Sequence, residues 1–194
     1  MTPAELLINH IQQRVRLNPE EAELLLPYFT LKKYKKKQFV VQPDFVAKYR
    51  SYVIEGAFRA YVIGEDGEEH TIQFGIEDWW ISDYNSYIFQ QPATMFVVAL
   101  EDSIVLQIDH ESETRLKGVL PKYAEFCLIT AERTAAFQQR RVINNLTLSA
   151  GQRYDKFMQQ YPKVSQRIPQ YALASYLGMT TQFLSRLRKK QAKS

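Results

Sequence analysis

The sequence has a single cysteine, Cys127, among its 194 residues. One thiol cannot form an intramolecular disulfide, a four-cysteine zinc site or a four-cysteine iron–sulfur cluster. The motifs of common catalytic sites are also missing, since there is no P-loop, dinucleotide-binding fingerprint, HExxH zinc motif or nucleophile elbow. We therefore expect that the protein is not an enzyme and that it holds neither a metal nor a cofactor.

Long hydrophobic runs are missing as well. The uncharged stretch 84–100 is broken by polar residues and by Pro92, and it is shorter than the ~20 apolar residues of a spanning helix. The N-terminus carries Glu5, Arg14 and Arg16 instead of the basic-then-apolar pattern of an export signal. We expect a cytoplasmic protein with no membrane partner.

Negative charge is nearly absent from the C-terminal part of the chain. Residues 1–150 carry 16 Lys and Arg against 20 Asp and Glu, whereas 151–194 carry nine basic residues and only Asp155. The nine are Arg153, Lys156, Lys163, Arg167, Arg186, Arg188, Lys189, Lys190 and Lys193. A basic module on a mildly acidic body indicates a polyanionic partner, although a solvated tail would have the same charge.

The first half of the chain has the pattern of a small β-rich domain. Apolar spacing predicts a helix over 3–17, and Asn18 followed by Pro19 predicts the start of a second helix. Short β-prone runs follow at 39–41, 52–54, 58–63, 71–74, 95–100 and 103–108. Turn residues separate them, and the strongest turn signal is 64–67. Many short strands at near-regular spacing predict an antiparallel β-roll over 31–110.

A stretch without glycine or proline predicts one long helix from about 122 to 146, which Gly151 would end. One stripe along it comprises Tyr123, Cys127, Ala131, Thr134, Gln138 and Val142, and the apolar residues outside that stripe are Phe126, Ile129 and Phe137. A second apolar face predicts a partner helix, most simply from a second copy of the chain. The alternative is that both faces pack within one chain. A shorter helix should follow and stop at Pro162.

The segment 168–190 has the pattern of a helix–turn–helix. Gly178 can adopt the positive φ that ends a first helix, and Thr180 is placed to cap a second. The residues expected to face inward are Leu173, Ala174, Leu177, Phe183, Leu184 and Leu187, and those expected to face outward are Thr181, Gln182, Ser185, Arg186, Arg188, Lys189 and Lys190. Glutamine pairs bidentately with adenine and arginine with guanine, each worth about 1–3 kcal/mol of discrimination in the major groove.

The order of β-roll, long helix and basic helix–turn–helix resembles the Crp/Fnr family of bacterial transcription regulators. The resemblance is carried by 170–178 and 184–190 in the DNA-binding signature, and by Asp66-Gly67, Gln73-Phe74, Trp79-Trp80 and 99–102 in the effector-type domain. It implies an α+β fold in three parts. These are a cyclic-nucleotide-binding-like β-roll with flanking helices at 1–120, a dimerisation helix at 121–147, and a small helical DNA-binding domain at 148–194.

The resemblance also implies a function, namely a homodimer that regulates transcription by binding a near-palindromic site in double-stranded DNA, with a small-molecule effector of unknown identity. Carried over by position, the base-reading residues are Thr181, Gln182 and Arg186, and the residues contacting the DNA backbone are Thr180, Ser185, Arg188 and Lys189.

The effector site departs from the family pattern. Members that bind cyclic AMP hold it with a Gly-Glu pair and, about ten residues later, an Arg-Ser or Arg-Thr pair. The matching segments here are Trp80-Ile81-Ser82-Asp83 and Gln91-Pro92-Ala93-Thr94. No arginine occurs between Arg59 and Arg115, so Asp83 would repel the phosphate with no arginine to bind it. We expect no cyclic AMP response at the candidate effector pocket, which comprises Trp80, Ser82, Asp83, Ala93 and Thr94.

Other features of the sequence leave alternatives open. His10, His70 and His110 could supply a haem ligand but carry no motif, and the aromatic residues of 79–89 could line an apolar pocket or belong to the core. The basic run 32–37 fits a lysine-guarded strand edge better than a second nucleic-acid contact. The competing function is a ligand-binding or protein-interaction module with a vestigial helix–turn–helix.

Overall fold

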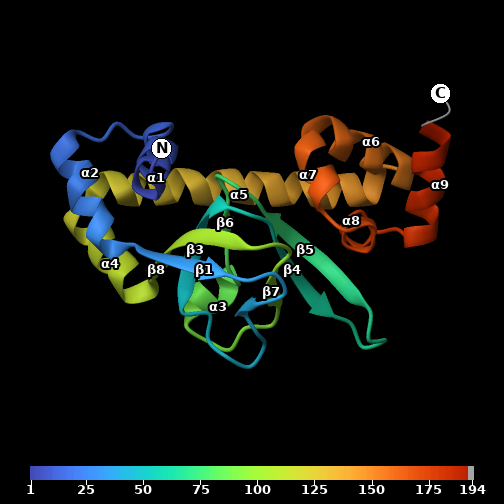
Figure 1. Cartoon of the computed structure of the whole chain (residues 1–194), viewed down its shortest axis with the longest axis horizontal. Coiled ribbons are helices and arrows are strands. Elements are labelled where there is room, and N and C mark those ends of the chain that lie inside the picture. The colour runs from blue at the N-terminus through green and yellow to red at the C-terminus, as the bar shows by residue number, and fades with distance from the viewer. Residues whose placement is uncertain (192–194) are drawn as a thin grey trace.

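The computed structural model describes residues 1–191 (Figure 1). A β-roll occupies the middle of the molecule, and one long helix, α5 (Pro121–Thr147), runs across it. The N-terminal helices lie near the start of α5, and the C-terminal helices lie near its end (Figure 1). In the described part of the chain, no helix is long and apolar enough to cross a lipid bilayer.

The helices that the sequence predicts begin close to the expected positions. In chain order they are α1 (Pro3–Gln12), α2 (Pro19–Leu25), the short 3₁₀ helix η1 (Leu26–Tyr28), α3 (Tyr84–Phe89), α4 (His110–Val119), α5, α6 (Ala150–Gln160), α7 (Pro162–Arg167), α8 (Gln170–Tyr176) and α9 (Thr181–Gln191). Thr2 and Asn18 cap α1 and α2 with capping boxes. The predicted helix 3–17 is too long, because the backbone leaves the helix after Gln12 although Val15 stays buried.

The strands form two four-stranded antiparallel sheets, as the sequence predicts for a β-roll. One sheet has the order β1 (Thr30–Tyr34), β8 (Ser103–Asp109), β3 (Tyr49–Glu55), β6 (Trp80–Ile81), and the other has the order β2 (Phe39–Val41), β7 (Phe96–Ala99), β4 (Phe58–Ile63), β5 (Glu69–Gly75). The predicted turn at 64–67 joins β4 to β5, with Gly67 at φ 80°. β1 and β5 are both edge strands.

Apolar clusters on both sides of one sheet hold this body together. Inside the roll, the fully buried side chains include Val53, Phe58, Val97 and Val105. Outside it, α1, α4 and α5 pack on the sheet through Leu7, Ile11, Leu116, Tyr123 and Phe126. Burying a side chain of this size contributes about 1.5–3 kcal/mol. The β-roll and the first part of α5 therefore form one body.

The end of the long helix differs from the prediction. α5 ends at Thr147, and Ser149 starts α6 with a capping box to Gln152. Gly151 lies within the first turn of α6 and does not break a helix. The break occurs at Ser149 because its side chain accepts the N–H of Gln152, which competes with continuation of α5.

Three helices were not predicted. α3 and α7 have six residues each, too few for an apolar periodicity to be recognised. α4 is mostly polar, and its buried residues are only Glu113 and Leu116. The predicted domain boundaries fall at Leu120, between α4 and α5, and at Thr147, the last residue of α5. The last predicted domain, 148–194, includes 192–194 with Lys193, which lie outside the described residues.

Candidate functional site

Two short helices, α8 and α9, meet at a tight turn. Gly178 has φ 65°, and the N–H of Met179 bonds the carbonyl of Ala174, which closes the end of α8. A residue with a Cβ would be strained at this φ, so glycine is required by the turn. The hydroxyl of Thr180 then accepts the N–H of Phe183 at 3.2 Å and starts α9. The predicted turn and cap are therefore both present.

The inner face of α9 is narrower than expected. Leu184 is fully buried and Leu187 is partly buried against α6 and α8. Phe183 was predicted to face inward, but it is 36% exposed and the guanidinium of Arg186 lies 5.7 Å from its ring centre. Position 183 is one residue before Leu184, so ~100° of helix rotation carries Phe183 away from the core.

The residues predicted to contact DNA lie on the outer side of α9. Those that are exposed are Thr180, Thr181, Gln182, Arg186 and Lys189, and those that are half-buried are Ser185 and Arg188. The side-chain amide of Gln182 forms no hydrogen bond with the side chains that the structure describes. The start of α9 therefore presents an amide and a guanidinium, one turn apart, to solvent.

The helix α8 is docked on the free edge of β5 through Ser175. Its hydroxyl accepts the N–H of Thr71 at 2.8 Å and donates to the carbonyl of Glu69 at 2.7 Å. One side chain thus satisfies a donor and an acceptor that an edge strand would leave to water. The sequence gives a weak signal for this contact, a small hydroxyl residue within an apolar helix.

An arginine from the long helix reinforces the same contact. Arg141 of α5 donates to the carbonyls of Thr71 and Ile72 on β5. Its guanidinium also lies 4.3 Å from the ring centre of Tyr176, and the ring of Phe74 packs against that of Tyr176 with centres 5.2 Å apart. Cation–π and aromatic contacts therefore fix α5, β5 and α8 relative to one another.

The acidic body and the basic C-terminal part meet at Arg167. Its guanidinium binds Glu77 through two hydrogen bonds, at 2.7 and 3.0 Å, and also pairs with Glu101. Burial alone would raise the pKa of Glu77, but the hydrogen bonds from Arg167 and from the N–H of Gly56 hold that pKa below its usual value. Part of the basic charge therefore serves attachment to the body rather than a distant partner.

The candidate effector segment is closed by its own carboxylate. Asp83 is completely buried, and it accepts the N–H of Ser86 at 3.0 Å and those of Thr94 and Met95 at 3.0 and 3.3 Å. The hydroxyl of Ser86 accepts the N–H of Ala47 and donates to the Gln91 carbonyl. Backbone N–H groups from the two candidate effector segments, 80–86 and 91–95, thus bond the carboxylate of Asp83.

The other predicted pocket residues are not all brought together. Ala93 and Thr94 lie beside Asp83, and the hydroxyl of Ser82 donates to the Tyr49 carbonyl at 2.8 Å. Trp80 belongs to a different cluster, where its indole donates to Nε2 of His10 at 3.4 Å and lies under the Arg50 guanidinium. The indole is therefore separated from the carboxylate that precedes α3.

A buried ion pair joins four elements beneath this segment, and sequence reasoning missed it. Arg50 of β3 binds Glu113 of α4 at 3.0 Å, and the hydroxyls of Tyr87 and Tyr123 donate to the same carboxylate at 3.1 and 3.0 Å. Burial favours the neutral acid, yet Arg50 and Lys117 outweigh it and hold the pKa of Glu113 below its usual value. The spacing of these residues in the sequence does not indicate that they form an ion pair.

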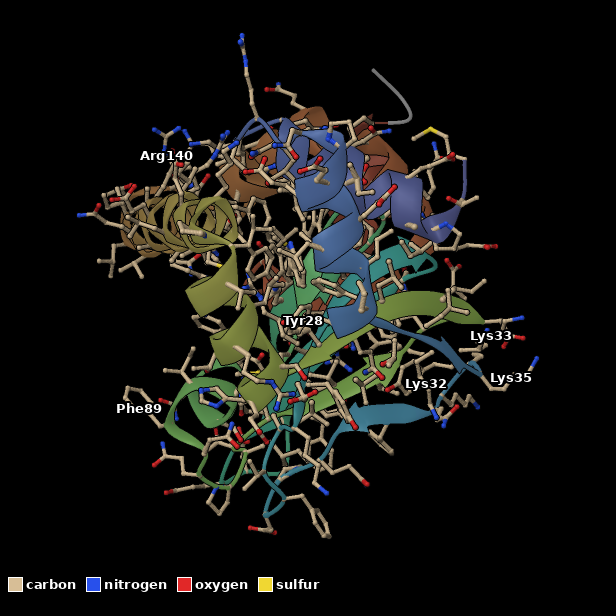
Figure 2. All side chains as sticks on the ribbon, turned by 90° about the vertical axis from the view of Figure 1, so that its left-hand side faces the viewer. Tyr28, Lys32, Lys33, Lys35, Phe89 and Arg140 are labelled. Atoms are coloured by element: carbon tan, nitrogen blue, oxygen red, sulfur yellow. The ribbon has the colours of Figure 1, made fainter. Side chains whose placement is uncertain are left out.

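Histidines and lysines occupy structural or surface positions. His10 is buried between aromatic rings, and burial followed by the nearby Arg14 lowers its pKa from 6.5 to about 4. Within residues 1–191, no cluster of three His, Cys, Asp or Glu side chains could hold a metal ion. Figure 2 shows Lys32, Lys33 and Lys35 pointing outward from the edge formed by β1, as predicted for a guarded edge.

Comparison with known families identifies the β-roll. Residues 31–116 match the family described as the cyclic nucleotide-binding domain. No curated protein matches the chain. The match includes both sheets apart from the first residue of β1, so the chain contains a domain of cyclic nucleotide-binding type.

Solved structures with a similar fold extend beyond that domain. CLP of Xanthomonas campestris, a c-di-GMP-responsive global regulator, has a TM-score of 0.72 at 15% identity, covering 91% of this chain and 92% of its own. FixK2 of Bradyrhizobium japonicum gives 0.70 at 19%, with 85% of both chains covered. A CooA mutant of Carboxydothermus hydrogenoformans gives 0.69 at 17%, covering 96% and 84%. The fold is therefore similar to that of Crp/Fnr-family regulators.

Proposed function

We propose that the protein is a homodimeric transcription regulator of the Crp/Fnr type, not an enzyme, and that α9 binds in the major groove of double-stranded DNA. One observation carries the proposal. The start of α9 is capped by Thr180 and anchored by the buried Leu184, and it exposes Gln182 and Arg186 on one side. A fixed helix that presents an amide and a guanidinium is suited to base edges.

The other residues of α9 supply contacts without sequence information. Hydroxyl and cationic side chains lie near Gln182 and Arg186 on α9, namely those of Thr180, Ser185, Arg188 and Lys189. Side chains of these types bind phosphates of the DNA backbone. Thr181 lies beside Gln182 and completes the base-reading set. The basic charge of the C-terminal part raises affinity for any DNA, whereas the two bidentate side chains select the sequence.

An uncovered apolar stripe on α5 supports the dimer. Leu128, Val142 and Leu146 are 60%, 58% and 81% exposed, and the small residues Ala131 and Ala135 lie between them. These positions are separated by three, four, seven and four residues, which is the spacing of a helix-packing seam. A second copy packed against the stripe would bury it and would relate two α9 helices by a two-fold axis, hence a near-palindromic site.

The effector is proposed to be something other than cyclic AMP at the usual segment. Asp83 already occupies the N–H groups of Ser86, Thr94 and Met95. A cyclic phosphate would have to displace a buried carboxylate, and no arginine lies nearby in the sequence to favour the exchange.

The test is selection of binding sites from random duplex DNA by the full chain, alongside Arg186→Ala. We expect enrichment of a near-palindrome that Arg186→Ala loses. Arg115→Ala, an exposed arginine of α4, is the matched control and should select the same sequence. Affinity should fall steeply with salt, because counterions are released when phosphates are bound.

Two results would contradict the proposal. Salt-sensitive binding without any consensus would show that the C-terminal part holds phosphates only. No binding at low salt would remove DNA from the function and favour the interaction module, in which α8 and α9 serve contacts with another protein.

A further inference from the structure

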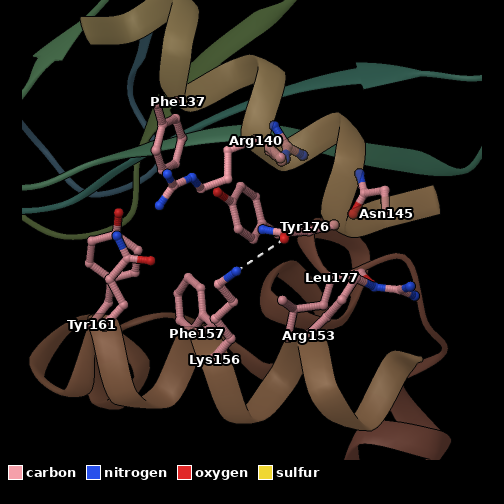
Figure 3. A pocket seen from close by; sticks show the side chains of 12 residues that line it. Phe137, Arg140, Asn145, Arg153, Lys156, Phe157, Tyr161, Tyr176 and Leu177 are labelled. Carbon is pink, nitrogen blue, oxygen red and sulfur yellow. Dashed lines mark hydrogen bonds between the residues drawn. The ribbon is translucent and has the colours of Figure 1, made fainter. Parts of the chain in front are cut away.

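A pocket lies where the long helix meets the C-terminal helices. It encloses about 110 Å³ and is open to solvent on one side. Its lining comprises Phe137, Arg140, Arg141, Asn144 and Asn145 of α5, Arg153, Lys156, Phe157 and Gln160 of α6, and Tyr161, Tyr176 and Leu177. Figure 3 shows Phe137 and Arg140 on α5 facing Lys156 and Phe157 across the opening.

The lining is cationic, with two arginines, Arg141 and Arg153, already engaged. Arg141 donates to carbonyls of β5, and Arg153 donates to the carbonyls of Leu148, Leu177 and Gly178. These bonds position the walls. They leave the other two basic residues of the lining for a ligand.

Arg140 and Lys156 are these two residues, one on each helix. Both are exposed, and neither forms an ion pair with any residue in the described part of the chain. Lys156 donates to the neutral amide oxygen of Asn144 at 3.1 Å. Among the residues that the structure describes, no acidic side chain lines the pocket. Two cations facing one opening without a counter-charge favour an anion there.

The floor of the pocket is aromatic. The rings of Phe157 and Tyr161 have centres 5.4 Å apart, and those of Phe157 and Tyr176 are 5.6 Å apart. Phe137 adds a ring at the rim that is 36% exposed. A planar ring can stack on such a surface, and side-chain amides that line the pocket can bond its edge.

We propose that this pocket binds a nucleoside monophosphate. The base would lie against the aromatic floor, and the phosphate would lie at the open rim between Arg140 and Lys156. A phosphate suits this pair because arginine binds it bidentately and lysine as a point charge. The volume admits one ring system and is too small for a dinucleotide.

The pocket stays accessible in the proposed dimer. At ~100° per residue, Phe137, Arg141 and Asn144 lie on the side of α5 that faces its own chain. Leu128 and Val142, in the stripe proposed to face the partner, lie on the opposite side. Dimer contact and ligand binding therefore use different faces of one helix.

The position of the pocket would let the ligand control DNA binding, and this step rests on the proposed function. The phosphate would join α5, which belongs to the body, to α6, which carries α8 and α9. Binding would therefore favour one orientation of α9 over others, and a shift in that population changes DNA affinity.

The experiment is isothermal calorimetry of the full chain, without DNA, with AMP, inorganic phosphate and adenosine. We expect AMP to bind at least tenfold more tightly than either fragment, because only AMP engages both the rings and the cations. Arg140→Gln and Lys156→Gln should each weaken AMP binding at least tenfold. Arg133→Gln, an exposed arginine on the same helix outside the pocket, is the control and should leave it unchanged.

Three results would overturn the proposal. No heat with AMP at millimolar concentration excludes the site, and AMP binding that survives both substitutions places it elsewhere. Arg140→Gln and Lys156→Gln that weaken DNA binding in a protein without AMP affinity would assign these cations to the DNA interface. Because AMP binding is measured without DNA, its failure is distinguishable from failure of the regulator proposal. Thermal unfolding of each variant verifies that it is folded.

Discussion

The buried carboxylate of Asp83 accepts a hydrogen bond from the backbone N–H of Thr94 at 3.0 Å. This bond joins the start of α3 to the segment that leads into β7, and the N–H of Met95 reinforces it. In the cyclic AMP-binding proteins that the sequence resembles, the corresponding two segments hold the phosphate. Here they hold each other through an anion that belongs to the chain.

Replacing Asp83 should destabilise the β-roll. Asp83→Asn retains the shape but removes the charge, and its amide NH₂ would face N–H groups that it cannot bond. We expect a loss of about 1–3 kcal/mol in the free energy of unfolding, the usual cost of leaving buried donors unsatisfied. Denaturant unfolding measures it. Asp44→Asn, at an exposed position with φ 69° that asparagine tolerates, should be nearly neutral.

Cyclic AMP should leave this segment unchanged. In the amide spectrum of the full chain, the signals of Ser86, Thr94 and Met95 should not move when cyclic AMP is added, because their N–H groups already bond Asp83. This residue-level measurement separates the segment from any binding elsewhere in the molecule. Saturable shifts confined to these three amides would show that the carboxylate can be displaced.

His10 should make stability depend on pH. Burial lowers its pKa in the folded chain to about 4, against 6.5 when unfolded. The unfolded chain therefore binds a proton that the folded chain does not accept between these values. The contribution of His10 to the free energy of unfolding is fully present above pH 6.5. It is lost as pH falls toward 4, by up to about 3 kcal/mol.

The variant His10→Gln isolates that contribution. Glutamine keeps an acceptor for the indole of Trp80 but does not titrate. Its free energy of unfolding should therefore fall less between pH 6.5 and 4 than that of the wild type. Parallel curves for His10→Gln and wild type would refute the assignment.

The periodic parts of the fold could be predicted from sequence. The strand 58–63 and the glycine turn after it follow from period-two spacing and turn chemistry, and the structure has β4 with those bounds. The helix start at Asn18 follows from a capping signal that depends only on neighbours. Local rules fail at Gly151, because the side chain of Ser149 decides the break three residues before Gln152.

The site shows the same division. Gly178, Thr180 and the exposed Gln182 were predictable, since a turn, a cap and a helix face are local properties. The docking of Ser175 on β5 was not, because its partners are more than 100 residues away in the chain. Trp80 and Asp83 fall in one segment that matches the family's effector site, yet the two side chains belong to different clusters.

The stripe on α5 should be needed for dimer formation. Leu128→Glu places a charge at a position that is 60% exposed in one chain but apolar in its proposed surroundings. We expect sedimentation to show a monomer that remains folded, because a single chain does not bury this side chain. Val119→Glu, at a similarly exposed apolar position on α4, should remain dimeric. A wild-type monomer at micromolar concentration would contradict the proposal.

Ser175 should affect the affinity for a full palindrome more than the affinity for a single DNA half-site. Ser175→Ala leaves the N–H of Thr71 and the carbonyl of Glu69 without their partner, so α8 should dock less firmly on β5. Two-fold binding requires both α9 helices at a separation of about 34 Å. A loosely docked domain must be ordered on binding, and that entropy opposes binding of the full site.

We therefore expect Ser175→Ala to weaken binding of a full palindrome about tenfold while affinity for a single half-site stays close to wild type. Thr114→Ala, whose hydroxyl bonds the carbonyl of His110 within α4, is the control and should affect neither. Hydrogen exchange at Thr71 should become faster in Ser175→Ala before any change in the β-roll core. An equal loss on full and half sites would mean that Ser175 supports α9 itself rather than the orientation of the domain.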